Sequence, residues 1–243
     1  MVFAILAAGE GSRLAHEGVT LPKPLVNING EPMIDRLIRI FIKAGAEKVV
    51  IINNDIHPQT KYHIQQLIGN NMPVELHVKT TPSSMHSFYE LMPYLGKKKF
   101  CLTTVDTIFR ENEFYRFIDD FKTTEFDGMM AATDFIDDEK PLYIATDNQL
   151  NITGFYDSID HFNCDNHINH AQSVCNLISG GIYCLDSKAF NTLERCMKSG
   201  MSRMRNFQRQ LIVDGLKLKA YKFSKILDVD HADDIKKAEE FLK

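Results

Sequence analysis

Three features that would assign this 243-residue chain to a special class of protein are missing from its sequence. Long apolar runs are missing: Val2–Ala8 and Val49–Ile52 fall far short of the roughly 20 residues that a membrane-spanning helix needs. A surplus of basic residues is missing, since 28 Lys and Arg against 32 Asp and Glu give a net charge of −4. Internal repeats and low-complexity segments are missing as well. Because the apolar runs are short, we expect no membrane span. Because a broad cationic surface is needed to hold a nucleic-acid backbone, we expect no nucleic-acid partner.

Cysteine is scarce, and its spacing is not that of a disulfide framework. The five cysteines form an odd set without a Cys-x-x-Cys pair, which suits reduced thiols in a core. No basic leader precedes the apolar run at Val2, so we expect no secretory signal and a cytoplasmic location. The 44% of hydrophobic and 25% of charged residues are typical of an ordinary globular protein.

Strand and helix patterns alternate over the first 105 residues, which indicates parallel strand pairing. Beyond residue 106 the pattern becomes mixed and partly antiparallel. A polar stretch over 157–172 is typical of a long functional or mobile loop. No linker interrupts the chain, so we expect one α/β domain over residues 1–243. The expected strands cover 2–6, 48–52, 74–78, 100–105, 128–133, 143–145, 152–156, 174–178, 181–185 and two short segments within 217–229. The expected helices cover 33–42, 62–68, 87–95, 113–121, 189–197, 205–213 and 233–242.

A glycine-rich loop, Gly9–Arg13, follows the first apolar strand directly. Its two glycines allow backbone N–H groups to turn towards an anion, which indicates phosphate binding. A P-loop is excluded because no Gly-Lys-Ser/Thr follows, and a dinucleotide fingerprint is excluded because Leu14 stands where its third glycine belongs. A plain turn between elements is the alternative.

A lysine, Lys23, lies between two prolines in the segment Leu21–Leu25. Each proline fixes its own φ near −65°, so the segment that carries the charge has little freedom. A surface lysine is normally mobile and solvated. The flanking prolines therefore favour a pre-positioned Lys23.

Three N-terminal segments together resemble the signature of the nucleotidyltransferases that make sugar nucleotides, the NDP-sugar pyrophosphorylase family; they are Leu6–Leu14, Leu21–Leu25 and Ile28–Ile34. The resemblance implies a three-layer α/β sandwich with a mostly parallel, Rossmann-like central sheet. It also implies a metal-dependent enzyme that moves a nucleoside monophosphate from a nucleoside triphosphate to a sugar 1-phosphate and releases pyrophosphate. The oligomeric state stays open.

The resemblance also implies roles for particular residues. It implies catalytic roles for Arg13, Lys23 and Asp106, with Mg²⁺ as the cofactor at Asp106. We expect nucleotide contacts from Leu6, Ala8, Gly9, Glu10, Gly11, Ser12, Lys79, Ser84 and Ser87. We expect acceptor contacts from Tyr156, Gly180 and Gly181, although the two glycines are equally typical of a bulge or a tight strand bend.

The carboxylates near the end of the chain are the remaining metal-ligand candidates. Asp106 ends an apolar strand, which places it at the carboxyl edge of the sheet, where open α/β folds bind ligands. The residues Asp228 and Asp230 lie in a segment, 226–235, that resembles the family's C-terminal signature; either could join the metal, since Mg²⁺ needs only one or two protein carboxylates. The alternative is that Asp230 caps the last helix and Asp228 is solvated.

Two segments depart from the family pattern, and both bear on the substrates. Residues 78–87 lack the usual glutamine and the Gly-Thr-Ala-Gly-like helix start, and the region around Ser87 is similar to phosphocholine cytidylyltransferases. Gly154–Ser158 stands where the family has Glu-Lys-Pro. A cytidylyltransferase that acts on phosphocholine or another small non-sugar phosphate is therefore an alternative.

Three further interpretations come from other classes of protein or site. Glycosyltransferases hold a metal with Asp-x-Asp, which the segment Asp228–Asp230 resembles, although they have no evident need for Lys23. A non-catalytic nucleotide-sugar sensor would bind the same ligands without releasing pyrophosphate. A zinc site could be formed by His161, Cys164, His167 and His170, but a single run of this kind is less typical of zinc than of a mobile loop over the acceptor.

Overall fold

The computed structural model describes residues 1–69, 72–137, 139–163 and 173–243. The strand β1 (Val2–Ala7) lies at the centre of the main sheet, between β4 (Lys48–Asn53) and β6 (Phe100–Thr104), and β5 (Val74–Val78) follows β4. All four strands are parallel. This confirms the parallel pairing that the alternation of strands and helices predicts, and the carboxyl ends of these strands meet at one edge.

The second half of the sheet is mixed, as the sequence predicts. β11 (Val174–Leu185) pairs antiparallel with β6, β8 (Gly128–Thr133) and β9 (Tyr143–Thr146). β10 (Ile152–Tyr156) pairs antiparallel with β9, and β12 (Leu218–Lys222) pairs parallel with β8.

The prediction of separate strands over 174–178 and 181–185 is wrong. They form one strand, whose register with β8 shifts between Ser179 and Tyr183. Gly181 lies inside this irregularity with φ +70°, a conformation that glycine adopts without strain. The glycines therefore bend a single strand where the sequence pattern indicated two.

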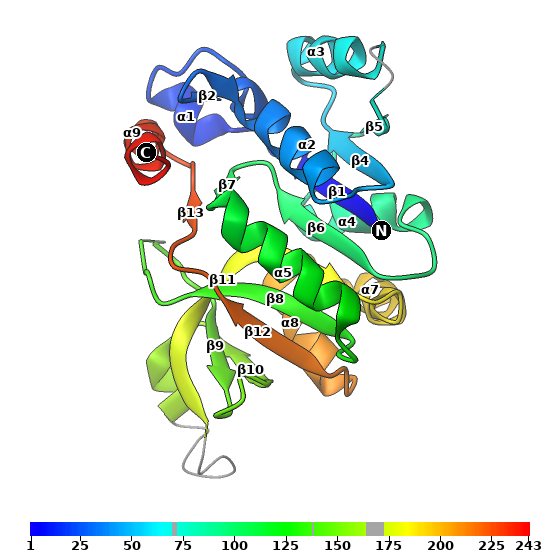
Figure 1. The fold of residues 1–243 in the computed structure, drawn as a ribbon, viewed down its shortest axis with the longest axis vertical. Coiled ribbons are helices and arrows are strands. Elements are labelled where there is room, and N and C mark those ends of the chain that lie inside the picture. The colour runs from blue at the N-terminus through cyan, green and yellow to red at the C-terminus, as the bar shows by residue number, and fades with distance from the viewer. Residues whose placement is uncertain (70–71, 138, 164–172) are drawn as a thin grey trace.

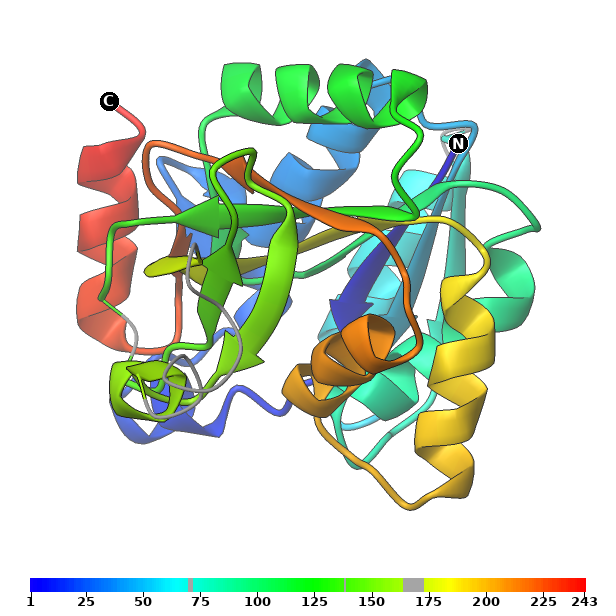
Figure 2. The same ribbon diagram turned by 90° about the horizontal axis from the view of Figure 1, so that it is seen from below.

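Helices cover both faces of the sheet, which confirms the three-layer sandwich (Figures 1 and 2). α2 (Met33–Lys43), α3 (Pro58–Gly69) and α5 (Glu111–Thr123) cover one face. α4 (Ser84–Leu91), α7 (Ala189–Lys198) and α8 (Met204–Val213) cover the other. Because side chains alternate along a strand, Phe3 of β1 packs into the first helical layer and Leu6 into the second.

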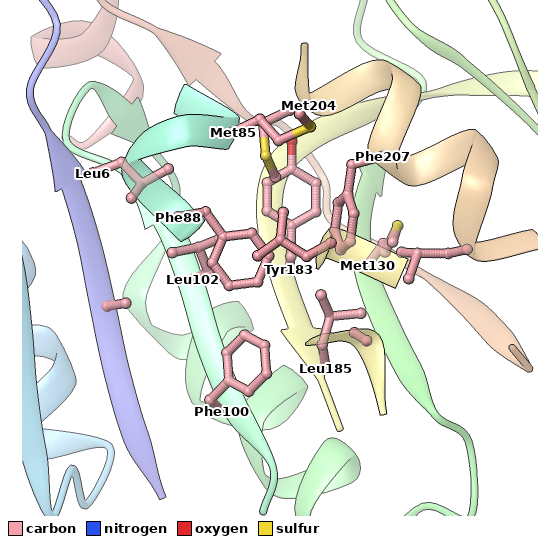
Figure 3. Packing of buried hydrophobic residues seen from close by; sticks show 14 of the residues in the cluster. Leu6, Met85, Phe88, Phe100, Leu102, Met130, Tyr183, Leu185, Met204 and Phe207 are labelled. Atoms are coloured by element: carbon pink, nitrogen blue, oxygen red, sulfur yellow. The ribbon is translucent and has the colours of Figure 1, made fainter. Parts of the chain in front are cut away.

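Aromatic packing fixes the second layer against the sheet (Figure 3). The ring of Phe88 in α4 lies 5.7 Å from that of Phe100 in β6 and 5.4 Å from that of Phe207 in α8, between ring centroids. All three side chains are fully buried. Such rings contribute most of the burial in a core, so α4 and α8 are held firmly relative to β6. The N-terminus of α4 is thereby placed at the carboxyl edge of the sheet.

Short elements join the two ends of the chain at this same edge. They are α1 (Ser12–His16), a 3₁₀ turn η1 (Lys23–Leu25), β2 (Asn27–Ile28), β3 (Glu31–Pro32), β7 (Thr107–Ile108), β13 (Leu227–Asp228) and α9 (Ala232–Phe241). A second 3₁₀ turn, η2 (Met92–Tyr94), instead follows the C-terminal end of α4. Buried Ala238 of α9 packs in one cluster with Leu14 and Ile28. The C-terminal helix therefore lies against the N-terminal segment (Figure 1).

The loop predicted over residues 157–172 is in part helical. Residues 159–163 form helix, and the Ser158 hydroxyl accepts a hydrogen bond from the backbone N–H of His161 at 3.3 Å. Serine at a helix start is a favourable cap, a signal that the polar composition of the segment concealed. Within the described parts of the chain, no helix is long and apolar enough to cross a membrane.

Candidate active site

The glycine-rich loop turns directly after β1 and lies against the segment that carries Lys23. Gly11 has φ +66°, and a Cβ atom at this position would lie 2.9 Å from Cβ of Lys23. Glycine at this position therefore allows both the left-handed backbone and the close approach of the two segments. Gly9 has ordinary φ and open space where its Cβ would be.

Lys23 forms ion pairs with two carboxylates from distant parts of the chain. Its Nζ lies 2.7 Å from Oδ1 of Asp230 and also contacts Oδ2 of Asp106. Only 11% of the side chain is exposed. Burial disfavours the charge, but the attraction of Asp106 and Asp230 outweighs it and raises the pKa of Lys23 above its ordinary value. The ammonium is therefore charged at neutral pH.

Arg13 reaches the same carboxylate from the other side. Its Nη1 donates to Oδ2 of Asp230 at 2.8 Å, while 58% of its side chain remains exposed. Burial favours the neutral acid at Asp230, yet the charges of Lys23 and Arg13 prevail and lower its pKa. Asp230 is therefore ionised and holds both basic side chains at one point.

Asp106 lies in the turn between β6 and β7, fixed from both sides. The hydroxyls of Thr104 and Thr107 share a hydrogen bond of 2.8 Å, and the N–H of Val229 donates to the carbonyl of Asp106 at 3.1 Å. The second bond ties this turn to the segment that carries Asp228 and Asp230. It explains why carboxylates more than 120 residues apart converge.

One carboxylate oxygen of Asp106 is suited to a cation. Oδ2 contacts Lys23, whereas Oδ1 is buried and has no hydrogen-bond partner within the residues that the structure describes. A buried carboxylate oxygen without a partner is costly, and a metal ion would satisfy it. No cluster of three or more His, Cys, Asp or Glu suited to a metal occurs among the described residues. Mg²⁺ commonly takes only one or two protein carboxylates, so Asp106 with Asp228 or Asp230 fits it.

Two cavities adjoin at these charges. The glycine-loop cavity, of about 360 Å³, is lined by the glycine-rich loop, Lys23, Asp106 and the start of α4. The Asp228 cavity, of about 810 Å³, is lined by Asp228, Gly180 and the start of α9. Arg13 and Asp230 line both. The site is therefore a pair of adjoining cavities that share Arg13 and Asp230, with Lys23 beside them in the glycine-loop cavity.

Most of the residues that the sequence predicts for the site lie in these cavities. Those lining the glycine-loop cavity are Leu6, Ala8, Gly9, Glu10, Gly11, Ser12, Arg13, Lys23, Ser84, Ser87, Asp106 and Asp230. Those lining the Asp228 cavity include Asp228 and Gly180.

Three predicted site residues are placed elsewhere. Lys79 pairs with Glu90 at 2.7 Å and is 57% exposed. The ring of Tyr156 packs against Phe162 at 5.3 Å between centroids. Gly181 faces the hydroxyl of Thr107, 3.3 Å from where its Cβ would lie. None of the three is among the described residues that line the two cavities.

Of two other expectations, the structure decides one and leaves the other untested. The alternative that Asp230 caps the last helix is wrong, because His231 occupies the cap and forms a capping box with Asp234. Of the zinc candidates, only His161 is described; Cys164, His167 and His170 lie outside the described residues.

The start of α4 supplies hydroxyl groups that the sequence indicated only in part. Ser83 is the N-cap, and its side chain accepts from the N–H of His86. Ser87 is almost fully buried and shares a 2.6 Å hydrogen bond with the hydroxyl of Thr81, which sequence reasoning missed. Thr81 lines the glycine-loop cavity, opposite the glycine-rich loop. The feature of the sequence that could have identified Thr81 is its position between β5 and α4, at the carboxyl edge of the sheet.

Comparison with known proteins assigns the chain to a family. The family model described as nucleotidyl transferase matches residues 3–243. The chain therefore belongs to the nucleotidyl transferase family, which confirms the resemblance of its N-terminal segments.

Two relatives are similar over shorter segments. One is a 2-aminoethylphosphonate cytidylyltransferase of Lancefieldella rimae, 40% identical over 58 residues. The other is a probable UDP-N-acetylglucosamine pyrophosphorylase of Acanthamoeba polyphaga mimivirus, 32% identical over 82 residues. The alignments cover 24% and 34% of this chain, and 24% and 31% of the relatives' own lengths.

Solved structures share the whole fold at low identity. The inositol-1-phosphate CTP transferase from T. maritima has a TM-score of 0.77 at 17% identity, with 100% of this chain and 97% of that chain covered. A putative glucose-1-phosphate thymidylyltransferase from Bacillus anthracis has 0.79 at 15%, with 99% and 95% covered. The CTP:phosphocholine cytidylyltransferase from Streptococcus pneumoniae has 0.75 at 20%, with 100% and 99% covered. These likenesses confirm the fold class.

Proposed function

We propose that this protein transfers a nucleoside monophosphate from a nucleoside triphosphate to a small phosphorylated acceptor and releases pyrophosphate. The observation that carries the proposal is the junction of the two cavities, where Arg13, Lys23, Asp106 and Asp230 meet. The triphosphate would lie along the glycine-rich loop, and the acceptor in the Asp228 cavity. The α-phosphorus would then lie at the junction, between the two reactants.

The reaction requires no nucleophilic side chain, because the acceptor phosphate is already anionic. Catalysis then depends on bringing two polyanions together in line and on neutralising the charge that builds up on the α-phosphate and the leaving pyrophosphate. Lys23 and Arg13 supply that positive charge from preorganised positions. Removal of one preorganised electrostatic group typically costs about 10² to 10³ in turnover, so Lys23→Ala is expected to lose activity on that scale.

We further propose Mg²⁺ as the cofactor, held by Asp106 together with Asp228 or Asp230. When bound, it would add positive charge beside the phosphates. Lys23 neutralises Asp106 and Asp230 in the ligand-free protein. With both carboxylates engaged by a metal, the Lys23 ammonium would be free to bind phosphate oxygens in the adjoining cavity.

The charge of the Asp228 cavity favours one class of acceptor. Its lining contains seven acidic residues, Glu17, Asp137, Glu139, Asp228, Asp230, Asp233 and Asp234, against five basic ones, Arg13, Lys140, Arg205, His231 and Lys237. An acidic compartment behind a basic junction suits a phosphate or phosphonate that carries an ammonium group at its other end. The segment shared with a 2-aminoethylphosphonate cytidylyltransferase supports this assignment.

A sugar 1-phosphate is the second candidate acceptor, which the family resemblance implies. The volume of the Asp228 cavity, about 810 Å³, accommodates a hexose phosphate. The absence of the family's Glu-Lys-Pro element in the sequence, where Gly154–Ser158 stands, weighs against it.

A screen for pyrophosphate release tests the proposal. The four common nucleoside triphosphates are each combined with 2-aminoethylphosphonate, phosphocholine, inositol 1-phosphate and a set of sugar 1-phosphates. We expect release that requires both substrates, with a cationic acceptor preferred. Nucleotide binding without release from any pair would instead support a sensor, and consumption of a nucleotide sugar with release of nucleoside diphosphate would support a glycosyltransferase.

A further inference from the structure

We propose that Asn54 is a positioning residue that holds the glycine-rich loop in its phosphate-binding conformation. Asn54 follows β4 directly, just as Ala8 and Gly9 follow β1, and the two strands are adjacent and parallel with Ala7 opposite Asn53. The Nδ2 atom of Asn54 donates to the carbonyl oxygens of Gly9 at 3.0 Å and Ala8 at 3.2 Å. The side chain therefore binds Ala8, the residue before the loop, and Gly9, the first residue of the loop. This inference rests on the proposed function, because it assigns the loop to phosphate.

The carboxamide of Asn54 is fully used. Its two N–H donors bind the two carbonyls, and its Oδ1 accepts from the backbone N–H of Ile56 at 3.2 Å. Asn54 is only 1% exposed. A buried carboxamide with every donor and acceptor engaged has one orientation available, so it fixes the groups that it binds.

The two carbonyl groups matter because of what they would otherwise face. A carbonyl oxygen that points into a phosphate site repels the polyanion, whereas the N–H groups of the same loop attract it. Asn54 directs the carbonyls of Ala8 and Gly9 towards the loop after β4. The N–H groups of the following residues are thereby left available to the glycine-loop cavity.

The segment Asn53–His57 also holds the opposite wall of that cavity. The side chain of Asp55 accepts a hydrogen bond from the hydroxyl of Thr80, and the N–H of Lys79 donates to the carbonyl of Asn53 at 2.8 Å. Thr81 and Ser83, just beyond, line the cavity. One segment therefore fixes both walls, although none of Asn53–His57 is among the described residues that line the cavity.

Asn54 therefore acts through the loop and touches no substrate, and this defines its test. The probe is inorganic tripolyphosphate with Mg²⁺, which has the phosphates of a nucleotide without its base or sugar. Asn54→Ser keeps an oxygen that can accept from the N–H of Ile56 but removes the two hydrogen bonds to the carbonyls of Ala8 and Gly9. We expect tripolyphosphate and nucleoside triphosphate to bind about tenfold or more weakly, because two hydrogen bonds that shape the loop are lost. KM for the triphosphate should rise far more than KM for the acceptor.

Asn53→Ser is the matched control, because Asn53 is equally buried and its Nδ2 donates, among the residues that the structure describes, to the carbonyl of Asn54 alone, at 2.7 Å. It should lower the melting temperature comparably and leave tripolyphosphate affinity near the wild-type value. The pair Asn54→Asp and Asn53→Asp repeats the comparison with nearly isosteric side chains and equal added charge, in case the serine variant does not fold. Amide hydrogen exchange over residues 9–13 of the ligand-free protein should accelerate in the Asn54 variants only.

The outcomes separate the inference from the proposed function. Wild-type protein that binds neither tripolyphosphate nor any nucleoside triphosphate overturns the proposed function and this inference with it. Wild-type protein that binds tripolyphosphate, together with an Asn54 variant that binds it equally well, overturns the inference alone. Equal weakening by the Asn53 and Asn54 variants also overturns it, because the effect would then be general destabilisation of the segment.

Discussion

Replacing Lys23 with methionine should make the ligand-free protein bind divalent metal more tightly. In the wild-type protein the Lys23 ammonium contacts both Asp106 and Asp230, so a metal that uses these carboxylates must first displace it. Methionine has a similar length and volume without the charge. Lys23→Met therefore leaves two neighbouring carboxylates that only Arg13 neutralises in part.

The magnitude follows from the bonds that the metal must break. A hydrogen bond to a charged group contributes about 1.5–3 kcal/mol, and the pair is only slightly screened, since 11% of the Lys23 side chain and 17% of the Asp106 side chain are exposed. If displacing Lys23 costs one such bond net, its removal should strengthen binding of Mn²⁺ or Mg²⁺ by about 10- to 100-fold, at about 1.4 kcal/mol for each factor of ten. Thermal stability of the variant should also respond more strongly to added metal.

The assay is a titration of nucleotide-free protein with Mn²⁺, in which free Mn²⁺ is measured by electron paramagnetic resonance. Arg13→Gln is the control: it also removes a positive charge beside Asp230, but from a side chain that is 58% exposed and that, within the described residues, forms its ion pair with Asp230 and none with Asp106. It should strengthen Mn²⁺ binding only a few-fold. Equal Mn²⁺ affinity in wild-type protein and Lys23→Met would refute the reasoning, and so would a gain that persists when Asp106→Asn is added.

Two further predictions concern the loop and the second helical layer. Gly11→Ala should weaken nucleoside triphosphate binding and lower stability by about 1–2 kcal/mol, because Gly11 has φ +66° and the new Cβ would press on Lys23. Gly9→Ala is the control and should leave chemical denaturation of the ligand-free protein nearly unchanged. Asp214→Asn should destabilise the fold by about 1.5–3 kcal/mol at neutral pH, because it weakens hydrogen bonds to a charged group. Burial disfavours the Asp214 carboxylate, but these hydrogen bonds and the charge of Arg195 outweigh burial and lower the pKa of Asp214. A depressed carboxyl pKa contributes stability that is fully present above the unfolded value of 3.8 and is lost as pH falls through the lower native pKa, so urea denaturation should show the difference shrinking over that range.

The sequence was sufficient to predict which charges meet. The family resemblance implied site roles for Arg13, Lys23 and Asp106, and the carboxyl ends of parallel strands must share one edge. Asp230 was predicted together with Asp228, and the ion pairs with Lys23 and Arg13 identify Asp230 as the one at the junction.

The parts that could not be predicted depend on contacts between distant backbone atoms. The hydrogen bonds of Asn54 to Ala8 and Gly9 join residues more than 40 positions apart, and neither of the two sequence segments carries a periodic pattern that would reveal them. The single bent strand around Gly181 gave the same local signal as two strands, because a bulge and a turn both use glycine. Local patterns therefore predicted the functional groups, whereas the backbone hydrogen bonds that orient them became visible only in three dimensions.

The arrangement of charges links folding to ligand binding. In the ligand-free protein, Arg13 and Lys23 balance Asp106 and Asp230, so the site carries no net charge from these four side chains and can fold without substrate. A metal on the acids and a triphosphate on the bases would exchange both sets of partners and preserve that balance. Metal binding would free the basic side chains for nucleotide, and nucleotide binding would free the carboxylates for metal. Each ligand should therefore raise the affinity for the other, and by linkage the two affinities must rise by the same factor.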